Sequence, residues 1–162
     1  MSEQTDTKVQ NNPQLQEFRQ DFALMIEAGF IAVKQLDEVS ATRIFYAAQA
    51  MNHFSTAPRI GLGYIALNRL EIKKATRIFE SVVNEEPDNY LAQVFLGICF
   101  LLTKGKMPKG EKLIKETLTK TKDATITNLG TLSLEWAEKD LKKIKAPFFI
   151  GGKQEDEQVE KK

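Results

Sequence analysis

The residue types that most often carry out chemistry are scarce in this chain. Cys99 is the single cysteine and His53 the single histidine, so no intramolecular disulfide can form and the usual zinc ligand sets cannot be assembled. Gly105 and Gly110 have the spacing that opens a nucleotide-binding loop, but the next two residues are Glu and Lys, where that loop needs Lys and then Ser or Thr. No arrangement of Ser, His and Asp suggests a nucleophile. We therefore predict no catalytic, metal or cofactor site, and a protein that is not an enzyme.

Lysine is concentrated in one stretch of the second half of the chain. The simplest interpretation is a solvated helix face, and the alternative is an electrostatic site that speeds the encounter with an acidic partner. Nucleic acid is not expected as a partner, because the net charge is only +1 and no aromatic or arginine platform is interleaved with the lysines. The lysines in question are Lys104, Lys106, Lys109, Lys112, Lys115, Lys120 and Lys122.

The length of 162 residues is typical of one domain. No window approaches the roughly 18 uninterrupted apolar residues of a membrane span, and the N-terminus lacks the apolar run of a secretory signal. We therefore expect a cytoplasmic protein with no membrane partner. Residues 1–12 and 147–162 are polar and charged, and we expect them to be disordered, although residues 148–150 form an apolar cluster, Phe-Phe-Ile.

An internal repeat organises the chain between these ends. Gly29, Gly63 and Gly97 recur at a constant offset of about 34 residues, and small residues of this kind let two helices approach closely. The units cover about 22–55, 56–89 and 90–124, and the third needs one inserted residue before its second half falls into register. The same offset relates Ala28 to Leu62 and Leu96, Ala32 to Ala66 and Phe100, Ala41 to Ala75, and Phe45 to Phe79.

Apolar residues recur at the three- and four-residue spacings of helices, and no strand alternation competes. We therefore predict an all-α domain over residues 13–146, built from three helix hairpins and a capping helix at 125–145. Pro87 should end one helix and Asp88 should cap the next. The cap should present a polar outer face. Its expected apolar stripe contains Ile126, Leu129, Leu132, Trp136, Leu141 and Ile144.

The repeat resembles the tetratricopeptide repeat, in which two antiparallel helices form each unit and the units stack as a solenoid. The middle unit matches best: it carries Leu62-Gly63-x2-Ala66, then Ala75-x3-Phe79, then Pro87. It departs from the family at Arg59, where Trp is usual, and at Ala66, where Tyr is usual.

A three-unit protein of this length also resembles the small cytosolic chaperones of bacterial type III secretion, over about residues 14–145. The stretch from Leu24 to Ala48 is similar to the opening of needle-subunit chaperones. The resemblance implies a client, an amphipathic helix of a secreted needle subunit, held in a concave groove so that it does not polymerise early, often beside a small helical co-chaperone. One alternative is the translocator chaperone, whose N-terminal dimerisation motif is not evident in residues 13–35. Another is an assembly scaffold that bridges two proteins.

In such a solenoid the first helix of each unit lines the groove. The residues on its groove side are spaced four and then three positions apart. All nine positions are apolar, which suits an amphipathic helix and disfavours a clamp for anionic peptide termini. Exposed together, they would form an unusually large apolar patch. The alternative is that they pack between neighbouring helices. The predicted groove residues are Ile26, Phe30, Val33, Ile60, Tyr64, Leu67, Val94, Ile98 and Leu101.

Overall fold

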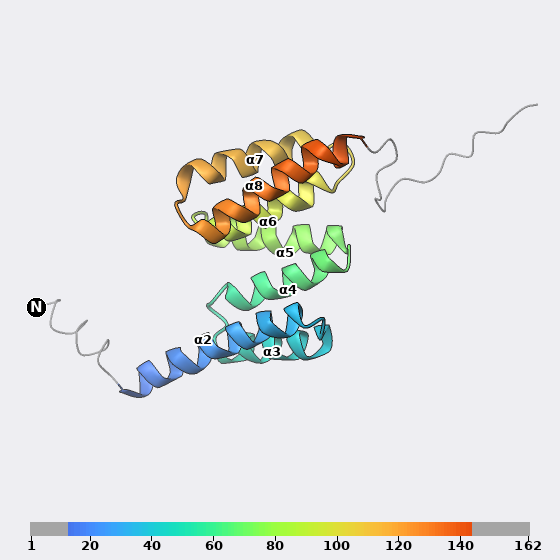
Figure 1. The fold of residues 1–162 in the computed structure, drawn as a ribbon. Helices are drawn as coiled ribbons and strands as arrows, with labels where there is room; N and C mark the ends of the chain where they lie inside the picture. Colours follow the sequence, from blue (N-terminus) through green and yellow to red (C-terminus); the bar gives the residue numbers. More distant parts are fainter. Residues whose placement is uncertain (1–12, 144–162) are drawn as a thin grey trace, which may run out of the picture.

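The computed structural model describes residues 13–143, so the expected disorder of residues 1–12 and 147–162 lies outside the described part. Within it the chain forms seven α-helices and one short 3-10 helix, with no strand (Figure 1). The predicted all-α fold class is confirmed. The helices are α2 (Pro13–Lys34), α3 (Glu38–Met51), α4 (Ala57–Asn68), α5 (Ile72–Glu85), α6 (Tyr90–Leu101), α7 (Met107–Lys120), α8 (Ala124–Lys139) and the 3-10 helix η1 (Leu141–Lys143).

The helices pack in pairs that follow one another along the chain. The helix α2 packs with α3, α4 with α5, and α6 with α7, while α3 contacts α4 and α5 contacts α6. Figure 1 shows this order from the blue α2 to the orange α8. The last helix, α8, packs against both α6 and α7. Each helix therefore contacts mainly helices that are close to it in sequence.

Helix starts follow local sequence rules. The side chain of Asp37 accepts a hydrogen bond from the Ser40 amide (3.0 Å) at the start of α3, and Asp123 does the same for Ile126 (3.0 Å) at the start of α8. These carboxylates satisfy amides that have no partner within the helix. At the start of α6 this role belongs to Asn89, so the expectation that Asp88 is the cap is wrong by one residue.

One large side chain on the second helix of each pair closes the pair by lying on a glycine of the first helix. A Cβ atom added at any of these glycines would come within 2.4–2.8 Å of that side chain. The spacing from the glycine to this side chain is the same in the first two pairs and one position longer in the third, which places the inserted residue where the sequence predicts it. The contacts are Phe45 on Gly29, Phe79 on Gly63, and Ile114 on Gly97.

The same three side chains also contact the first helix of the next pair. In all three cases the contacted residue follows the contacting side chain by the same number of positions in the sequence. One buried side chain thus holds three helices together, and the repeat in the sequence is also a repeat of packing. These contacts are Phe45 on Gly61, Phe79 stacked on Phe95 with ring centroids 5.1 Å apart, and Ile114 on Gly130.

The turn inside the first pair repeats in the second, and the third pair also contains a left-handed residue. Leu36 (φ 63°), Leu70 (φ 58°) and Gly105 (φ 78°) adopt left-handed backbone conformations just after the first helices. After α2 the amide of Asp37 donates to the Ala32 carbonyl (2.9 Å) and the amide of Leu36 donates to that of Val33 (3.0 Å). This hydrogen-bond pattern ends a helix with a left-handed residue, a position that glycine usually occupies. The first two turns have this pattern with a leucine at the left-handed position, whereas in the third turn the amide of Lys106 donates to the Thr103 carbonyl (3.0 Å).

Replacing Leu36 by Gly is expected to raise the free energy of unfolding by up to about 1 kcal/mol. The left-handed conformation costs a non-glycine residue roughly 1–2 kcal/mol, and glycine removes this cost. Glycine also loses more conformational entropy on folding, which offsets about 0.5–1 kcal/mol of the gain. Leu36 is 87 % exposed, so little packing is lost. Urea denaturation measures the change. Leu36→Ala keeps the strained backbone and should stay within about 0.5 kcal/mol of the wild type; a destabilised glycine variant would contradict the argument.

The structure corrects the expected apolar stripe of the capping helix. The side of α8 that faces the protein is formed by Gly130, Ser133 and Ala137, which are buried. Leu132 and Trp136 are instead 64 % and 40 % exposed. Ile126 and Leu129 are half-buried, Leu141 is buried in η1 and Ile144 lies outside the described residues. The outer face of α8 is therefore not wholly polar.

Candidate protein-binding surfaces

The structure buries most of the predicted groove. Six of its nine residues are at most 8 % exposed, and the other three are half-buried. The expectation that all nine are exposed together is wrong, because the first helices pack on one another: α2 contacts α4, α4 contacts α6, and α8 covers part of α6. The buried six are Val33, Ile60, Leu67, Val94, Ile98 and Leu101; the half-buried three are Ile26, Phe30 and Tyr64.

Aromatic contacts explain why the half-buried residues of this face are not simply exposed. The Phe30 ring packs edge-on against Phe45, with centroids 5.2 Å apart, and lies 6.3 Å from Tyr64. Tyr64 in turn lies 5.4 Å from Phe95. This row of rings joins the core of the first pair to the larger core of the other two. Contact of a client with Ile26, Phe30 or Tyr64 stays a prediction.

Exposed apolar side chains are concentrated in the first helix pair. Eight of the eleven large apolar side chains that are exposed within residues 13–143 lie between positions 18 and 54. Scattered apolar residues are normal on a protein surface, whereas such a concentration makes the first pair the candidate site of interaction. The eight are Phe18, Leu24, Ile31, Leu36, Val39, Tyr46, Met51 and Phe54.

Spacing places four of these residues in two stripes. Leu24 and Ile31 are seven residues apart on α2, and Val39 and Tyr46 are seven apart on α3. Seven residues make two helical turns, so each pair shares one side of its helix, opposite the buried side. We call these four residues the outer apolar stripes. The signal was present in the sequence, but α2 and α3 each carry a second apolar side, which packs inward.

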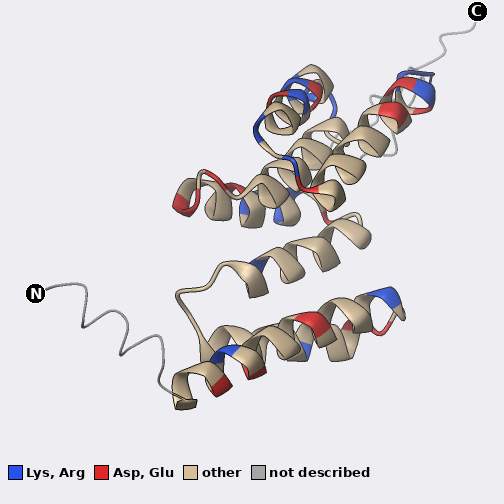
Figure 2. Ribbon diagram, turned by 60° about the vertical axis from the view of Figure 1, so that its left-hand side comes forward, with Lys and Arg blue, Asp and Glu red and all other residues tan. Residues whose placement is uncertain are grey.

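Charge borders the stripe on α2. Glu17 and Glu27 are exposed and lie close to the side of the helix that carries Leu24 and Ile31. In contrast, α4 and α6 carry a single charged residue between them, Arg59, and Figure 2 shows these helices almost entirely in tan. A partner of the α2 stripe should therefore combine an apolar face with basic flanks.

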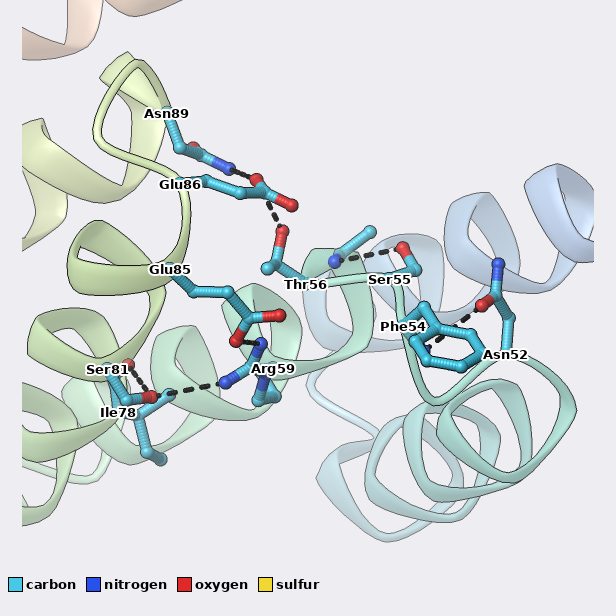
Figure 3. A network of polar contacts seen from close by, with 11 residues as sticks. Asn52, Phe54, Ser55, Thr56, Arg59, Ile78, Ser81, Glu85, Glu86 and Asn89 are labelled. Atoms are coloured by element: carbon cyan, nitrogen blue, oxygen red, sulfur yellow. Dashed lines mark hydrogen bonds and ion pairs between the residues drawn. The ribbon is translucent and has the colours of Figure 1, made fainter.

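Polar contacts within the second pair, and at the turn that leads to α6, serve the fold. The Thr56 hydroxyl donates to Glu86 (2.8 Å), which also accepts from the Asn89 amide group (2.8 Å), and Arg59 pairs with Glu85 (Figure 3). These bonds tie the start of α4 to the end of α5. No buried side-chain nitrogen or oxygen lacks a partner within the described residues.

The remaining candidate sites have structural explanations. A hollow of about 590 Å3 between the α5–α6 turn and α8 is lined by Glu86, Asn89 and Ile126 among others, and the side chains of Glu86 and Asn89 already bond each other. Cys99 is buried, and burial raises the pKa of its thiol to about 12. Burial and the raised pKa both disfavour the thiolate, which is the form that reacts as a nucleophile or in thiol–disulfide exchange.

The lysine-rich stretch is solvent-exposed. All seven of its lysines are exposed, which fits a solvated face. Two of them cover an apolar ring: the ammonium groups of Lys106 and Lys109 lie 5.5 Å and 4.3 Å from the centre of Phe100. Both ammonium groups are therefore within cation–π range of this ring. An acidic partner at this stretch stays a prediction.

None of the helices in residues 13–143 combines the length and apolar character that crossing a bilayer requires. The same residues hold no group of three or more His, Cys, Asp or Glu side chains placed to bind a metal ion. Comparison with protein-family models, with curated proteins and with solved structures finds no match for this chain.

Proposed function

We propose that the protein is a cytoplasmic, non-enzymatic chaperone with a tetratricopeptide-like solenoid, which holds an amphipathic helix of a partner. The observation that carries this proposal is the concentration of exposed apolar side chains on α2 and α3. The repeated packing of Phe45, Phe79 and Ile114 supports the solenoid. Apolar side chains that are exposed to water do not stabilise a monomer. Their concentration on one helix pair therefore favours a protein-binding surface there.

The resemblance to needle-subunit chaperones suggests the client class, a secreted helical subunit kept from polymerising. The structure favours the outer apolar stripes over the buried groove residues as the place of first contact. A helix with apolar residues seven apart and basic flanks would match Leu24 and Ile31 together with Glu17 and Glu27. The small helical co-chaperone implied by the same resemblance would bind the α2 stripe through the same kind of helix, with apolar residues seven apart and basic flanks.

Replacing both Leu24 and Ile31 by Glu is expected to weaken binding of the needle subunit from the same cell by about 100-fold or more. Burying each such side chain is worth roughly 1.5–3 kcal/mol, and a charge in its place removes that gain. The subunit is co-expressed with the full chain, and affinity is measured by co-purification and calorimetry, with helical circular dichroism as the check of folding. Leu132→Glu, at an equally exposed position on α8, is the matched control and should bind normally.

If the variant with Glu at both Leu24 and Ile31 binds with unchanged affinity, α2 is not part of the binding site. Loss of binding in the Leu132→Glu control would instead move the binding site to α8. A second candidate function is a scaffold that bridges two proteins. One observation supports that candidate: Leu132 and Trp136 expose apolar side chains on the last helix, apart from those of the first pair. A bridging protein needs two such surfaces, whereas a simple chaperone needs one.

A further inference from the structure

The outward side of α2 corresponds to a covered side of the later first helices. On α2 the residues Leu24, Glu27 and Ile31 are exposed. The residues that match them one repeat and two repeats further along the chain are all buried. The outer side of α2 is therefore a side that the stack covers in α4 and α6. The matching residues are Pro58, Gly61 and Ile65 on α4, and Ala92, Phe95 and Cys99 on α6.

The second helix of the preceding pair covers this side in α4 and α6. The Phe45 ring of α3 lies on Gly61, and the Phe79 ring of α5 stacks on Phe95 with centroids 5.1 Å apart. Glu27 is the residue of α2 that matches these two contact points. Within residues 13–143 no helix precedes α2, so no described helix does for α2 what α3 does for α4. The outer side of α2 thus has the position of a helix contact without its second helix.

The first residues of α2 do not fold back over this side. The helix α2 has 22 residues, whereas α4 and α6 have 12 each. Its additional residues, 13–22, lie where the later pairs have a loop and the end of the preceding second helix. Figure 1 shows this part of α2 continuing past the end of α3. Residues 13–22 therefore lead away from Glu27, and a helix of another molecule can approach it without displacing them.

Glu27 determines which helices can dock in this position. Its carboxylate forms no ion pair within the described residues. A helix that covers Leu24 and Ile31 would also take this carboxylate out of water, and burying an unpaired carboxylate is costly. The docked helix must therefore carry Lys or Arg at the point where α3 and α5 carry Phe, with apolar residues on either side of it.

We propose that the partner helix docks on α2 as a preceding second helix would, with a Lys or Arg side chain paired with Glu27 and apolar residues on Leu24 and Ile31. The proposal rests on the proposed function, because it takes the α2 stripe as the client site, and it adds the register of docking and the residue that selects the partner. A helix of 14 residues, the length of α3 and α5, is long enough to cover the stripe. A helix with an apolar residue at the central point would leave the carboxylate unpaired and is selected against.

Substitution of Glu27 in the full-length chain tests the register. Glu27→Lys should weaken binding of the co-expressed needle subunit at least about 30-fold, because it places like charges in contact inside the interface. Glu27→Gln keeps the shape and removes the charge, and should weaken binding about tenfold, because the partner's cation is left without its carboxylate. Calorimetry measures the affinities, and circular dichroism checks that each variant is folded.

Two further charge reversals separate a specific pair from general attraction. Glu17→Lys lies about 15 Å from Glu27 along α2, beyond the roughly 10 Å that a helix of this length extends to either side of its centre. It should therefore weaken binding by no more than about threefold, through loss of steering alone. Glu80→Lys changes the net charge by the same amount at an exposed position of α5. It is the control and should bind normally.

The results distinguish failure of this proposal from failure of the proposed function. If the Leu24→Glu, Ile31→Glu variant loses binding while Glu27→Lys and Glu27→Gln bind as the wild type does, α2 remains the site and the proposed register is wrong. Equal weakening by Glu17→Lys and Glu27→Lys would also overturn the register. Tighter binding by Glu27→Gln would mean that the carboxylate only keeps this end of the stack in water.

Two results would reject the partner itself. If the wild-type chain binds no subunit, or if no α2 variant changes its affinity, the proposed function is wrong and this proposal is wrong with it. If sedimentation shows that the free chain is a dimer, and the Leu24→Glu, Ile31→Glu variant is a monomer, a second copy of the chain covers the stripe instead.

Discussion

Replacing Gly110 by Ala is expected to lower the free energy of unfolding by about 2 kcal/mol or more, because it overpacks a close helix crossing. An added Cβ would lie 2.6 Å from the carbonyl oxygen of Gly97 and 2.7 Å from the amide nitrogen of Leu101. Both atoms belong to the backbone of α6, so relief requires that α6 and α7 move apart. Overpacking of this kind costs roughly 1–3 kcal/mol where side chains can adjust, and here it outweighs the roughly 1 kcal/mol that alanine gains over glycine inside a helix.

Gly130→Ala provides the matched control. Gly130 is also buried inside a helix, but the atoms nearest to its added Cβ are the ends of the Leu118 and Ile114 side chains, at 2.8 Å and 3.1 Å. A flexible side chain can turn away, so we expect a change within about 1 kcal/mol of either sign. Urea denaturation followed by circular dichroism compares the two variants. Equal stability of both would show that the α6–α7 contact is not the closest helix approach.

Phe45→Ala is expected to cost about 3–5 kcal/mol. The Phe45 ring is fully buried and lies on Gly29 of its own pair and on Gly61 of the next one. Its removal leaves a cavity at a point where three helices meet, so the first pair should loosen from the second. Tyr46→Ala, the adjacent position, removes a largely exposed ring and should change stability by no more than about 0.5 kcal/mol.

Hydrogen exchange locates the effect of the Phe45 substitution. Amides of α2 and α3 should exchange much faster in the Phe45→Ala variant, while those of α6 and α7 keep most of their protection, because contacts run mainly between neighbouring helices. Uniform loss of protection along the described helices would contradict this expectation and would indicate one cooperative unit.

The helical class and the phase of the repeat were predictable from the sequence, because both depend on local rules. Gly29, Gly63 and Gly97 had to be small for the paired helices to touch, and a residue type with no side chain is easy to recognise at a fixed offset. The inserted residue in the third pair was also predictable, since Ile114 keeps its register only if one position is added. These features require no knowledge of how the pairs stack.

The candidate site could not be predicted in the same way. Periodicity shows which sides of a helix are apolar, but the angle between successive pairs decides which apolar side is covered. On α2 the side of Phe30 packs against Tyr64, and the side of Leu24 and Ile31 stays exposed. On α8 the packing of Gly130, rather than the size of the apolar residues, decides that Trp136 faces outward.

The position of Phe45, Phe79 and Ile114 between consecutive helix pairs has a consequence for synthesis on the ribosome. Each of these side chains meets one partner roughly half a repeat before it in the chain and another roughly half a repeat after it. Contacts of such short range form quickly, because little loop entropy opposes them. A nascent chain can therefore complete one pair while the next is still being translated. Every completed pair then presents the ring or branched side chain on which the following helix can assemble.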